Sequence, residues 1–428
     1  MESKDKDLKD FEDGKDENQR RERRGLSRRQ LLGGTAALAG VAAVGAAGSI
    51  ACAAPAPSPM RFRPLGKTGL SVSEIGFGGY PVDEPETVRY AFERGITYFD
   101  TAHCYRGGRS EEVIGEGLRG IRDKVVLTTK WCPHHIGKPA TKANFLAMLD
   151  GSLKRLKTDH VDVLLNHEVG KNSDGQGVAR LQNPEMFEAF EVAKQAGKAR
   201  FLGFSGHDPD LMSIMDWGIA SGRFQVMLGR YSFLDYPEQT KRIAEARRRG
   251  MGVVAMKTLA GAKGADLDKF RDRYTNFKQA ALKWVLSNPN VSNLIISINS
   301  KRQVDDYAAA SGQKLAEADL SILAEYEAAF TNEVCRFEGA CLPACPENVR
   351  IADILRFSMY YHEYKQENRA VEAYAKLVEA ERAAHCLHCA GFCEAACSYD
   401  LPVRSLLLRA HGALASHGAG ESAGERAG

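Results

Sequence analysis

Short apolar runs alternate with longer amphipathic segments between residue 71 and about residue 312. In the longer segments apolar residues recur every three or four positions, which is the period of a helix with one buried face. The short runs are almost continuously apolar, as buried parallel strands are. The predicted helices include Glu86–Arg94, Ala143–Leu156, Pro184–Ala196, Glu238–Arg249 and Phe277–Leu286, and the predicted strands are Val72–Gly78, Thr97–Thr101, Lys124–Lys130, Val161–His167, Arg200–Ser205, Arg223–Arg230, Gly252–Lys257 and Asn293–Ile298.

This alternation predicts an α/β fold of the (β/α)8 TIM-barrel type over residues 60–325. Eight strands, each with a following helix, over roughly 250 residues match that architecture. A doubly wound parallel sheet is the alternative, but no G-x-G-x-x-G fingerprint follows the first predicted strand. Ahead of the barrel, Phe62–Leu70 contains a Gly-Lys-Thr-Gly turn signal and predicts a hairpin.

Residues 1–54 differ from the barrel in composition. Residues 1–24 are densely charged, without apolar periodicity, and are predicted to be disordered. Arg28 and Arg29 then precede a soft apolar run that ends in small residues, a layout typical of a bacterial export signal and similar to the twin-arginine type. We therefore predict a periplasmic or exported protein. An uncleaved signal would instead anchor the chain in a membrane, and a cytoplasmic protein with a misinterpreted N-terminus is a third hypothesis.

Composition is that of an ordinary folded chain, with 44% hydrophobic and 26% charged residues. The formal net charge is only +3, so no nucleic-acid partner is expected. Ten cysteines in 428 residues lie below the density of disulfide scaffolds. Seven of them lie between Cys335 and Cys397, and this clustering predicts a local metal or cluster site.

Polar side chains stand at the carboxyl ends of three adjacent predicted strands, where barrel enzymes keep their catalytic groups. Asp100 lies at the end of the second strand with Tyr105 in the following loop, Lys130 ends the third strand, and His167 ends the fourth. A tyrosine hydroxyl has an ordinary pKa of about 10, but a nearby ammonium group stabilises its phenolate and an aspartate holds that ammonium. Tyr105 is thus a candidate general acid toward a carbonyl oxygen, which a neutral His167 would orient.

At these positions the sequence resembles the aldo/keto reductase superfamily. The matching stretches are Leu65–Leu70, Phe99–Tyr105, Gly107–Glu111, Thr129–Lys130, Asp159–His167 and Gly252–Lys257. The resemblance implies a barrel with NADP(H) across its rim and a small carbonyl or alcohol substrate. It also implies that Tyr105 is the general acid, that Lys130 and Asp100 tune it, and that His167 orients the substrate.

The same resemblance implies the cofactor-binding residues Ser205, Tyr231, Lys301 and Arg302. Ser205 would hold the nicotinamide amide, Tyr231 would stack on the nicotinamide ring, and the two basic residues would hold the adenine 2′-phosphate. The sequence departs from the family pattern in three places. Gly206 replaces an Asn, Leu228 replaces a Gln, and Ile296-Ser297 replaces the usual Pro-Gly turn before the phosphate-binding segment. Each lost amide partner costs about 1–3 kcal/mol of binding. The alternative function is therefore a non-enzymatic electron-transfer or binding protein on a barrel that has lost nicotinamide use.

Residues 331–411 resemble the α-helical ferredoxin domain that is appended to some aldo/keto reductases. Two-cluster ferredoxins repeat C-x2-C-x2-C-x3-C-P, and the fourth cysteine of each run binds the other cluster. The first cysteine group fits this frame if Glu338 replaces the second cysteine, and the second group has one extra residue. Between the groups, Ile351–Ala384 is helical in pattern. The Gly/Ala/Ser-rich tail Gly412–Gly428 is predicted to be disordered.

The ferredoxin resemblance implies two unequal iron–sulfur sites. The complete set for a 4Fe–4S cluster is Cys345, Cys386, Cys389 and Cys393, and the set for a 3Fe–4S or incomplete cluster is Cys335, Cys341 and Cys397 with Glu338 nearby. A zinc site formed by Cys386, Cys389, Cys393 and Cys397 is an alternative. Disulfides are a third interpretation, although seven cysteines leave one over. Cys104 and Cys132 lie beside the barrel site, and the sequence assigns them no role.

Taken together, these features predict an exported aldo/keto reductase-like oxidoreductase with an attached iron–sulfur electron relay and a redox partner protein. Hydride chemistry moves two electrons at once and each cluster moves one, so direct coupling between the two needs a mediator.

Overall fold

The computed structural model describes residues 60–167, 177–207, 210–234, 237–259, 274–330, 334–362 and 366–416. The chain divides into two units, Met1–Ala56 and Pro57–Gly428, and all described residues belong to the second. The predicted export signal lies outside the described residues. Within the described ranges, no helix is both long and apolar enough to cross a lipid bilayer.

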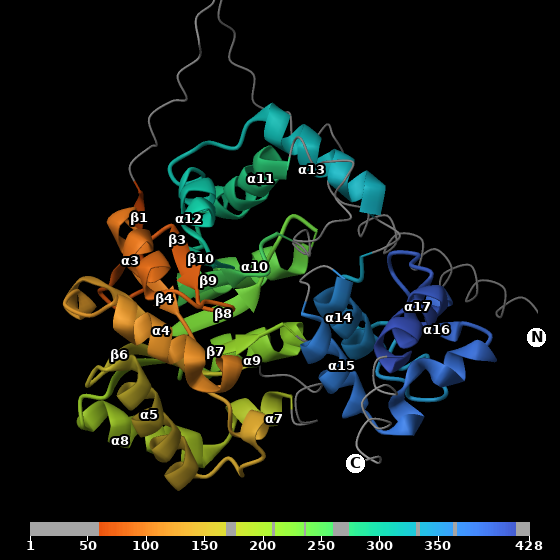
Figure 1. Ribbon diagram of the computed structural model, residues 1–428, viewed down its shortest axis with the longest axis horizontal. Coiled ribbons are helices and arrows are strands. Elements are labelled where there is room, and N and C mark those ends of the chain that lie inside the picture. The colour runs from red at the N-terminus through yellow and green to blue at the C-terminus, as the bar shows by residue number, and fades with distance from the viewer. Residues whose placement is uncertain are drawn as a thin grey trace, which may run out of the picture. The chain divides into compact units, whose positions relative to one another are not determined.

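Eight parallel strands close into a barrel in which the order around the ring follows the chain (Figure 1). The predicted TIM barrel is thereby confirmed, and each strand lies within a few residues of its predicted position. The strands are β3 (Ile75–Gly78), β4 (Tyr98–Asp100), β5 (Val126–Trp131), β6 (Val161–Asn166), β7 (Ala199–Gly206), β8 (Val226–Arg230), β9 (Gly252–Met256) and β10 (Asn293–Ser297). Pairing of β10 with β3 closes the ring.

The first predicted strand is divided in two. Its opening residues form β2 (Ser71–Ser73), which pairs antiparallel with β1 (Phe62–Pro64), and the barrel strand begins only at Ile75. The hairpin turn lies against the start of β9, where Lys67 N donates to Gly250 O at 2.7 Å. Gly66 has a φ of +59°, and a Cβ there would lie 2.3 Å from Gly252 N. Only glycine therefore allows the hairpin to approach this closely.

Helices cover the outside of the barrel (Figure 1). They are α3 (Pro85–Glu93), α4 (Arg109–Gly117), α5 (Lys142–Leu156), α7 (Val178–Leu181), α8 (Pro184–Gln195), α9 (Leu211–Ser221), α10 (Pro237–Arg248), α11 (Tyr274–Ser287), α12 (Lys301–Ala308) and α13 (Glu317–Phe330). Side chains at the caps set several starts: Thr141 accepts from the N–H of Asn144 ahead of α5, and Ser300 accepts from Gln303 ahead of α12.

Successive strand residues face two different cores, which explains why the strands are continuously apolar. In β8, Val226 and Leu228 pack in one cluster with Val163, Leu165 and other residues, whereas Met227 packs in the larger cluster that includes the helices. The first set lies inside the ring of strands, because alternate side chains of a strand point to opposite faces. Leu228 is 1% exposed.

Glu74 connects the hairpin to the segment after α12. Its carboxylate accepts hydrogen bonds from Arg63 Nε (2.8 Å), Ser311 Oγ (3.0 Å) and the backbone N–H of Gly312 (2.9 Å). Burial acts to raise the pKa of Glu74, but the Gly312 N–H, the Arg63 charge and the Ser311 hydroxyl outweigh it and lower the pKa. The ionised carboxylate is therefore the form that stabilises the fold.

We expect Glu74→Gln to lower the free energy of unfolding by about 2–3 kcal/mol at neutral pH, because it weakens charge-assisted hydrogen bonds at a buried site. Urea unfolding measures the effect. Since the folded pKa of Glu74 is lowered, its contribution is present above the unfolded pKa and is lost as pH falls through the folded pKa. The difference between wild type and variant should thus shrink below about pH 4. Glu191→Gln, at an exposed site on α8, is the matched control; an equal effect of both changes would contradict the prediction.

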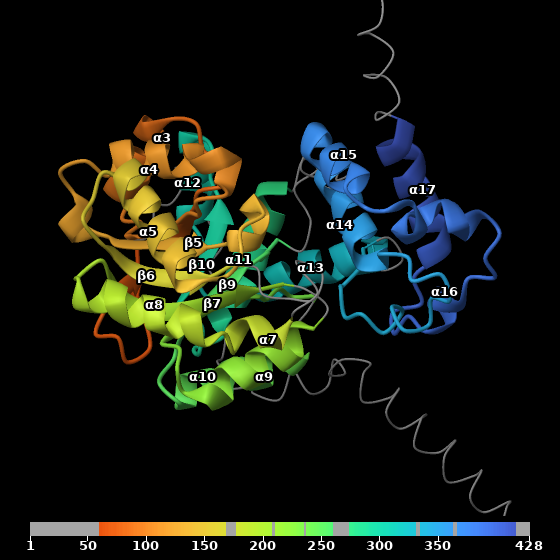
Figure 2. The same ribbon diagram turned by 90° about the horizontal axis from the view of Figure 1, so that it is seen from below.

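The C-terminal module is helical, as expected, and has its own core. Its elements are α14 (Ile351–His362), α15 (Glu367–Ala375), α16 (Phe392–Ala395) and α17 (Val403–Ser416), with 3₁₀ turns at Glu379–Glu381 and Ala383–Leu387. Helices α14, α15 and α17 pack on one another (Figure 2). The prediction that the tail is disordered from Gly412 onward is wrong at its start, because α17 continues to Ser416.

Candidate active site

The four predicted catalytic residues meet at the carboxyl ends of β4, β5 and β6. Lys130 Nζ donates to the Asp100 carboxylate, to the Thr101 carbonyl oxygen at 2.6 Å and to the Tyr105 hydroxyl at 3.3 Å. The side chains of Lys130 and Asp100 are each 1% exposed. Burial raises the pKa of Asp100, and the Lys130 ammonium opposes the rise. The lysine is thus held in one position, with its charge directed at the tyrosine oxygen.

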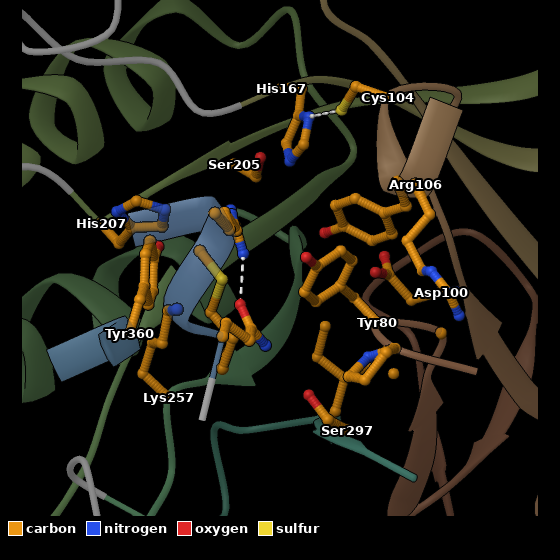
Figure 3. Close-up of a pocket in the computed structure, with 18 of the residues that line it drawn as sticks. Tyr80, Asp100, Cys104, Arg106, His167, Ser205, His207, Lys257, Ser297 and Tyr360 are labelled. Atoms are coloured by element: carbon orange, nitrogen blue, oxygen red, sulfur yellow. Dashed lines mark hydrogen bonds between the residues drawn. The ribbon is translucent and has the colours of Figure 1, made fainter. Parts of the chain in front are cut away.

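His167 lies on the other side of Tyr105. The two rings meet edge to face with centroids 5.6 Å apart. Nδ1 of His167 lies 3.4 Å from Cys104 Sγ and 3.2 Å from Cys132 Sγ. Its second ring nitrogen therefore points away from the sulfur atoms and into the pocket, as Figure 3 shows. Tyr105 and His167 together present a hydroxyl and an imidazole nitrogen to the same space.

These residues line a cavity of about 1350 Å³ (Figure 3). Its barrel side includes Gly78, Asp100, Ser205, Leu228 and Ser297. The other side is built from α14 and α15 and the residues after them, among them Phe357, Tyr360 and Arg369. Cation–π contacts join the two sides, with Lys257 Nζ 5.6 Å from the Tyr360 ring centroid and Arg369 4.7 Å from that of Tyr80. The site is therefore shared between the barrel and the C-terminal module.

Basic side chains predominate around this cavity. They are Arg106, Lys130, Arg155, Lys257, Lys278, Arg350, Arg356, Arg369 and Lys376, against the acidic Asp100, Asp353 and Glu372. Arg106 and Lys257 also have positive φ angles of 52° and 58°. Such a backbone costs on the order of 1–3 kcal/mol and is concentrated at functional sites. The excess of basic side chains favours an anionic ligand.

The predicted cofactor residues are not all brought to the cavity. Ser205 lines it, and it is 1% exposed. Tyr231 is not among the lining residues: its ring packs on Trp284 with centroids 5.2 Å apart, and its hydroxyl bonds with Thr240 at 2.9 Å. The structure thus does not bring Tyr231 to this cavity, and its role as the stacking ring stays a prediction.

Lys301 and Arg302 are exposed at the start of α12 and are also absent from the cavity lining. Their neighbours Asn299 and Gln303 line it instead. The predicted phosphate-binding segment is thus near the cavity, but the residues that face it are the polar ones on either side of the basic pair.

Several residues that line the cavity were not predicted from the sequence. Tyr80 follows β3 and packs edge-on against Tyr105 with centroids 5.2 Å apart. His207 follows β7 and Lys257 follows β9, so the strand-end rule that found Lys130 would have found them too. Tyr360 and Arg369 belong to the C-terminal module, and no pattern in the sequence indicated that it faces the barrel site.

The C-terminal cysteines influence one another electrostatically across the two runs. Burial raises the pKa of Cys386 to about 11, and the nearby thiols of Cys393, Cys345 and Cys389 add to the rise. In the same way burial, followed by Cys335, Cys397 and Cys393, raises the pKa of Cys341 to about 12. Thiols that influence one another electrostatically lie close together. Cys345 therefore lies near the second cysteine run and Cys397 lies near the first, and the two sets also approach each other at Cys341 and Cys393.

An internal repeat produces this crossed arrangement. Three residues after Cys345 the chain turns at Asn348, and three residues after Cys397 it turns at Asp400, each with a φ of 52°. The N–H of each turn residue donates to the cysteine carbonyl, at 3.3 and 3.2 Å. Helices α14 and α17 then begin six residues after the respective cysteine. The module thus contains two similar segments. Each of them carries one cysteine, Cys345 or Cys397, that is directed toward the other segment.

Polar groups surround the sulfur atoms. The N–H of Phe337 donates to Cys335 Sγ and that of Gly391 donates to Cys389 Sγ, both at 3.4 Å. Glu338 accepts a hydrogen bond from the N–H of Ser398 at 3.3 Å, directly after Cys397. The carboxylate therefore lies against the three-cysteine group. Backbone hydrogen bonds to sulfur are among the features that tune iron–sulfur clusters.

The protein is thus a closed (β/α)8 barrel with a buried Lys–Asp pair, a tyrosine and a histidine at its carboxyl rim. The sequence profile of the aldo/keto reductase family matches residues 80–328, which is more than half of the chain. The chain belongs to the aldo/keto reductase family. The match ends before the first cysteine of the C-terminal module.

The chain is also similar to individual curated proteins and to solved structures. L-galactose dehydrogenase of Arabidopsis thaliana is 28% identical over 288 residues, covering 59% of this chain and 88% of that protein. L-glyceraldehyde 3-phosphate reductase of Escherichia coli K12 is 27% identical over 293 residues, covering 62% and 80%. Among solved structures, the holo form of an aldo-keto reductase from Bacillus halodurans is 25% identical, covers 62% of this chain and 96% of that chain, and has a TM-score of 0.48.

Proposed function

We propose that this protein is an exported NADP(H)-dependent oxidoreductase that interconverts a small carbonyl compound and its alcohol. The observation that carries the proposal is the buried Lys130 Nζ, which is held by Asp100 and lies 3.3 Å from the Tyr105 hydroxyl. A cation at this distance favours the phenolate and so makes the tyrosine a usable acid and base. Both named relatives act on sugar-type alcohols or carbonyls by their names, which supports a polar substrate.

In the proposed reaction the substrate oxygen binds between the Tyr105 hydroxyl and the second ring nitrogen of His167. Tyr105 donates its proton to that oxygen during reduction and takes it back during oxidation. Lys130 stabilises the resulting phenolate, and Asp100 keeps Lys130 in place. NADP(H), when bound, supplies or accepts the hydride at the substrate carbon. The residues of α14 and α15 limit the access of water to the cavity.

The described residues fit a nicotinamide nucleotide. The cavity is large enough for an extended cofactor, and its basic lining suits phosphate groups. Ser205 and His207 offer polar atoms near the tetrad, and Asn299 and Gln303 do so near the start of α12. Leu228, which is buried and lines the same cavity, is the feature that favours the second candidate, an electron-transfer or binding protein without nicotinamide use.

A fluorescence titration of the anaerobically purified protein with NADPH tests the choice between these two functions. We expect saturable binding in the micromolar range, because the basic lining offsets the missing amide partners. NADH, which lacks the 2′-phosphate, is the matched control and should bind more weakly. No binding of either nucleotide, in protein whose visible absorbance shows intact clusters, would contradict the reductase proposal and support electron transfer.

For the C-terminal module we propose two iron–sulfur clusters that exchange electrons with a redox partner protein. The ligands would be Cys345, Cys386, Cys389 and Cys393 for a 4Fe–4S cluster, and Cys335, Cys341 and Cys397, with Glu338 beside them, for a 3Fe–4S or incomplete cluster. Such clusters supply one-electron steps when they are bound. The close sulfur groups, the N–H···S hydrogen bonds and the internal repeat support the proposal.

The export proposal rests on Arg28 and Arg29 ahead of the apolar run. The twin-arginine signal is a receptor-read address, so replacing both arginines with lysine is expected to keep the protein in the cytoplasm. Cell fractionation followed by immunoblotting measures this. Export of the double-lysine variant at the wild-type level would contradict a twin-arginine route, and recovery of the wild-type protein in the membrane fraction would indicate an uncleaved anchor.

A further inference from the structure

A second cluster of reactive side chains lies directly behind the active site. It consists of His103 and Cys104 after β4, Cys132 after β5 and His167 after β6. The sulfur atoms of Cys104 and Cys132 are 3.0 Å apart, and a ring nitrogen of His103 is 3.0 Å from Cys132 Sγ. Donor atoms of these three residues all lie within 4.8 Å of one another. Nδ1 of His167 adds contacts of 3.2 and 3.4 Å to the two sulfur atoms.

Ordinary packing does not account for this convergence. A cysteine in a core usually behaves as a small apolar side chain, whereas here two thiols face each other and two imidazole rings. The three residues His103, Cys132 and His167 are buried and Cys104 is half-buried. Thiolate sulfur and imidazole nitrogen are the donors that zinc and related ions prefer. Such ions bind sulfur at about 2.3 Å and nitrogen at about 2.0–2.1 Å, so tetrahedral donors stand roughly 3.3–3.8 Å apart. The nitrogen–sulfur separations of 3.0–3.4 Å are close to the roughly 3.5 Å that such a site needs. The two sulfur atoms, 3.0 Å apart, would have to separate to roughly 3.8 Å when an ion binds.

We propose that His103, Cys104 and Cys132 bind a divalent metal ion of the zinc class, with Nδ1 of His167 completing the ligand set. Two thiolates balance the double charge of the ion, which suits a buried site. This site shares no ligand with the C-terminal cysteine groups. It requires neither nicotinamide binding nor turnover, so it stands apart from the proposed function.

A metal ion bound at this site would fix which ring nitrogen of His167 carries the proton. When one ring nitrogen of a histidine binds a metal, the other carries the proton. The pocket-facing nitrogen of His167 would then always be an N–H donor toward a substrate oxygen. The sequence separates the ligands by up to 64 positions, but neighbouring strands of the barrel bring them together.

A cobalt(II) titration of the anaerobic holoprotein, compared with the Cys104→Ser/Cys132→Ser double variant, tests the site. Cobalt replaces zinc and reports thiolate ligands through a charge-transfer absorption band. We expect the wild-type protein to bind one more cobalt ion per chain than the double variant. The charge-transfer band should be correspondingly weaker in the double variant. The difference between the two proteins removes any contribution of the C-terminal cysteines.

Ser205→Ala changes the same cavity outside the cluster and should keep the full cobalt content. Circular dichroism shows whether each variant is folded. If the double variant does not fold, His103→Gln, which leaves both thiols intact, provides a second test. Equal cobalt binding by the wild-type protein and a folded ligand variant would overturn the proposal. So would a non-reducing mass measurement that shows Cys104 and Cys132 joined in a disulfide in the purified protein.

Discussion

Tyr105→Phe is expected to lower kcat for carbonyl reduction by roughly 10²–10⁴-fold, the usual contribution of a positioned general acid. The variant keeps the ring that packs on Tyr80 and His167 but removes the hydroxyl that faces Lys130 Nζ. The substrate oxygen then has no proton donor at the point where negative charge develops. KM should change much less, because most of the cavity is untouched. Steady-state kinetics with NADPH and a small aldehyde measure the effect.

Tyr90→Phe is the matched control, since it removes a hydroxyl that bonds only outside the cavity, to Asp305 on α12. Lys130→Met supplies a second readout, because loss of the ammonium group should move the pH dependence of oxidation to higher pH. Turnover of a folded Tyr105→Phe protein at the wild-type rate would show that Tyr105 is not the acid. It would leave the barrel fold and the iron–sulfur proposal unaffected.

Cys386→Ser is expected to remove about four iron atoms per chain, the content of one 4Fe–4S cluster. Cys386 is buried at 6% exposure, and Cys393, Cys345 and Cys389 lie near it. Iron and acid-labile sulfide analysis measures the loss. Cys104→Ser, which lies in the barrel, should leave the iron content unchanged. Wild-type protein that contains zinc and no iron would contradict the cluster proposal.

The crossed arrangement makes a sharper prediction with two further variants. Cys345 belongs to the first cysteine run but stands beside the second, so Cys345→Ser should affect the same cluster as Cys386→Ser. Cys397→Ser should affect the other cluster together with Cys335→Ser. Electron paramagnetic resonance separates 3Fe–4S from 4Fe–4S signals. If Cys345→Ser and Cys335→Ser instead altered one common signal, the crossing would be wrong.

The barrel was predictable because its signals are local. A buried strand such as Val161–Asn166 faces apolar cores on both sides, so its sequence is apolar throughout, and the helices between strands carry their own period. Topology then placed Asp100, Lys130 and His167 at one rim, because the carboxyl ends of parallel strands meet there. The split of Val72–Gly78 into a hairpin strand and a barrel strand was not predictable, since both pieces are apolar and the division depends on their partners.

The sequence by itself determined the barrel, the four polar residues at its rim and the two cysteine runs, all of which follow from short-range patterns and spacing. Tertiary structure decided the rest. It turned Tyr231 toward Trp284, placed Asn299 and Gln303 rather than Lys301 and Arg302 in the cavity, and brought Cys104 and Cys132 to His167. It also set Tyr360 and Arg369 opposite the barrel site. Each of these outcomes depends on side-chain direction and on contacts between segments that are distant in sequence, which local patterns do not encode.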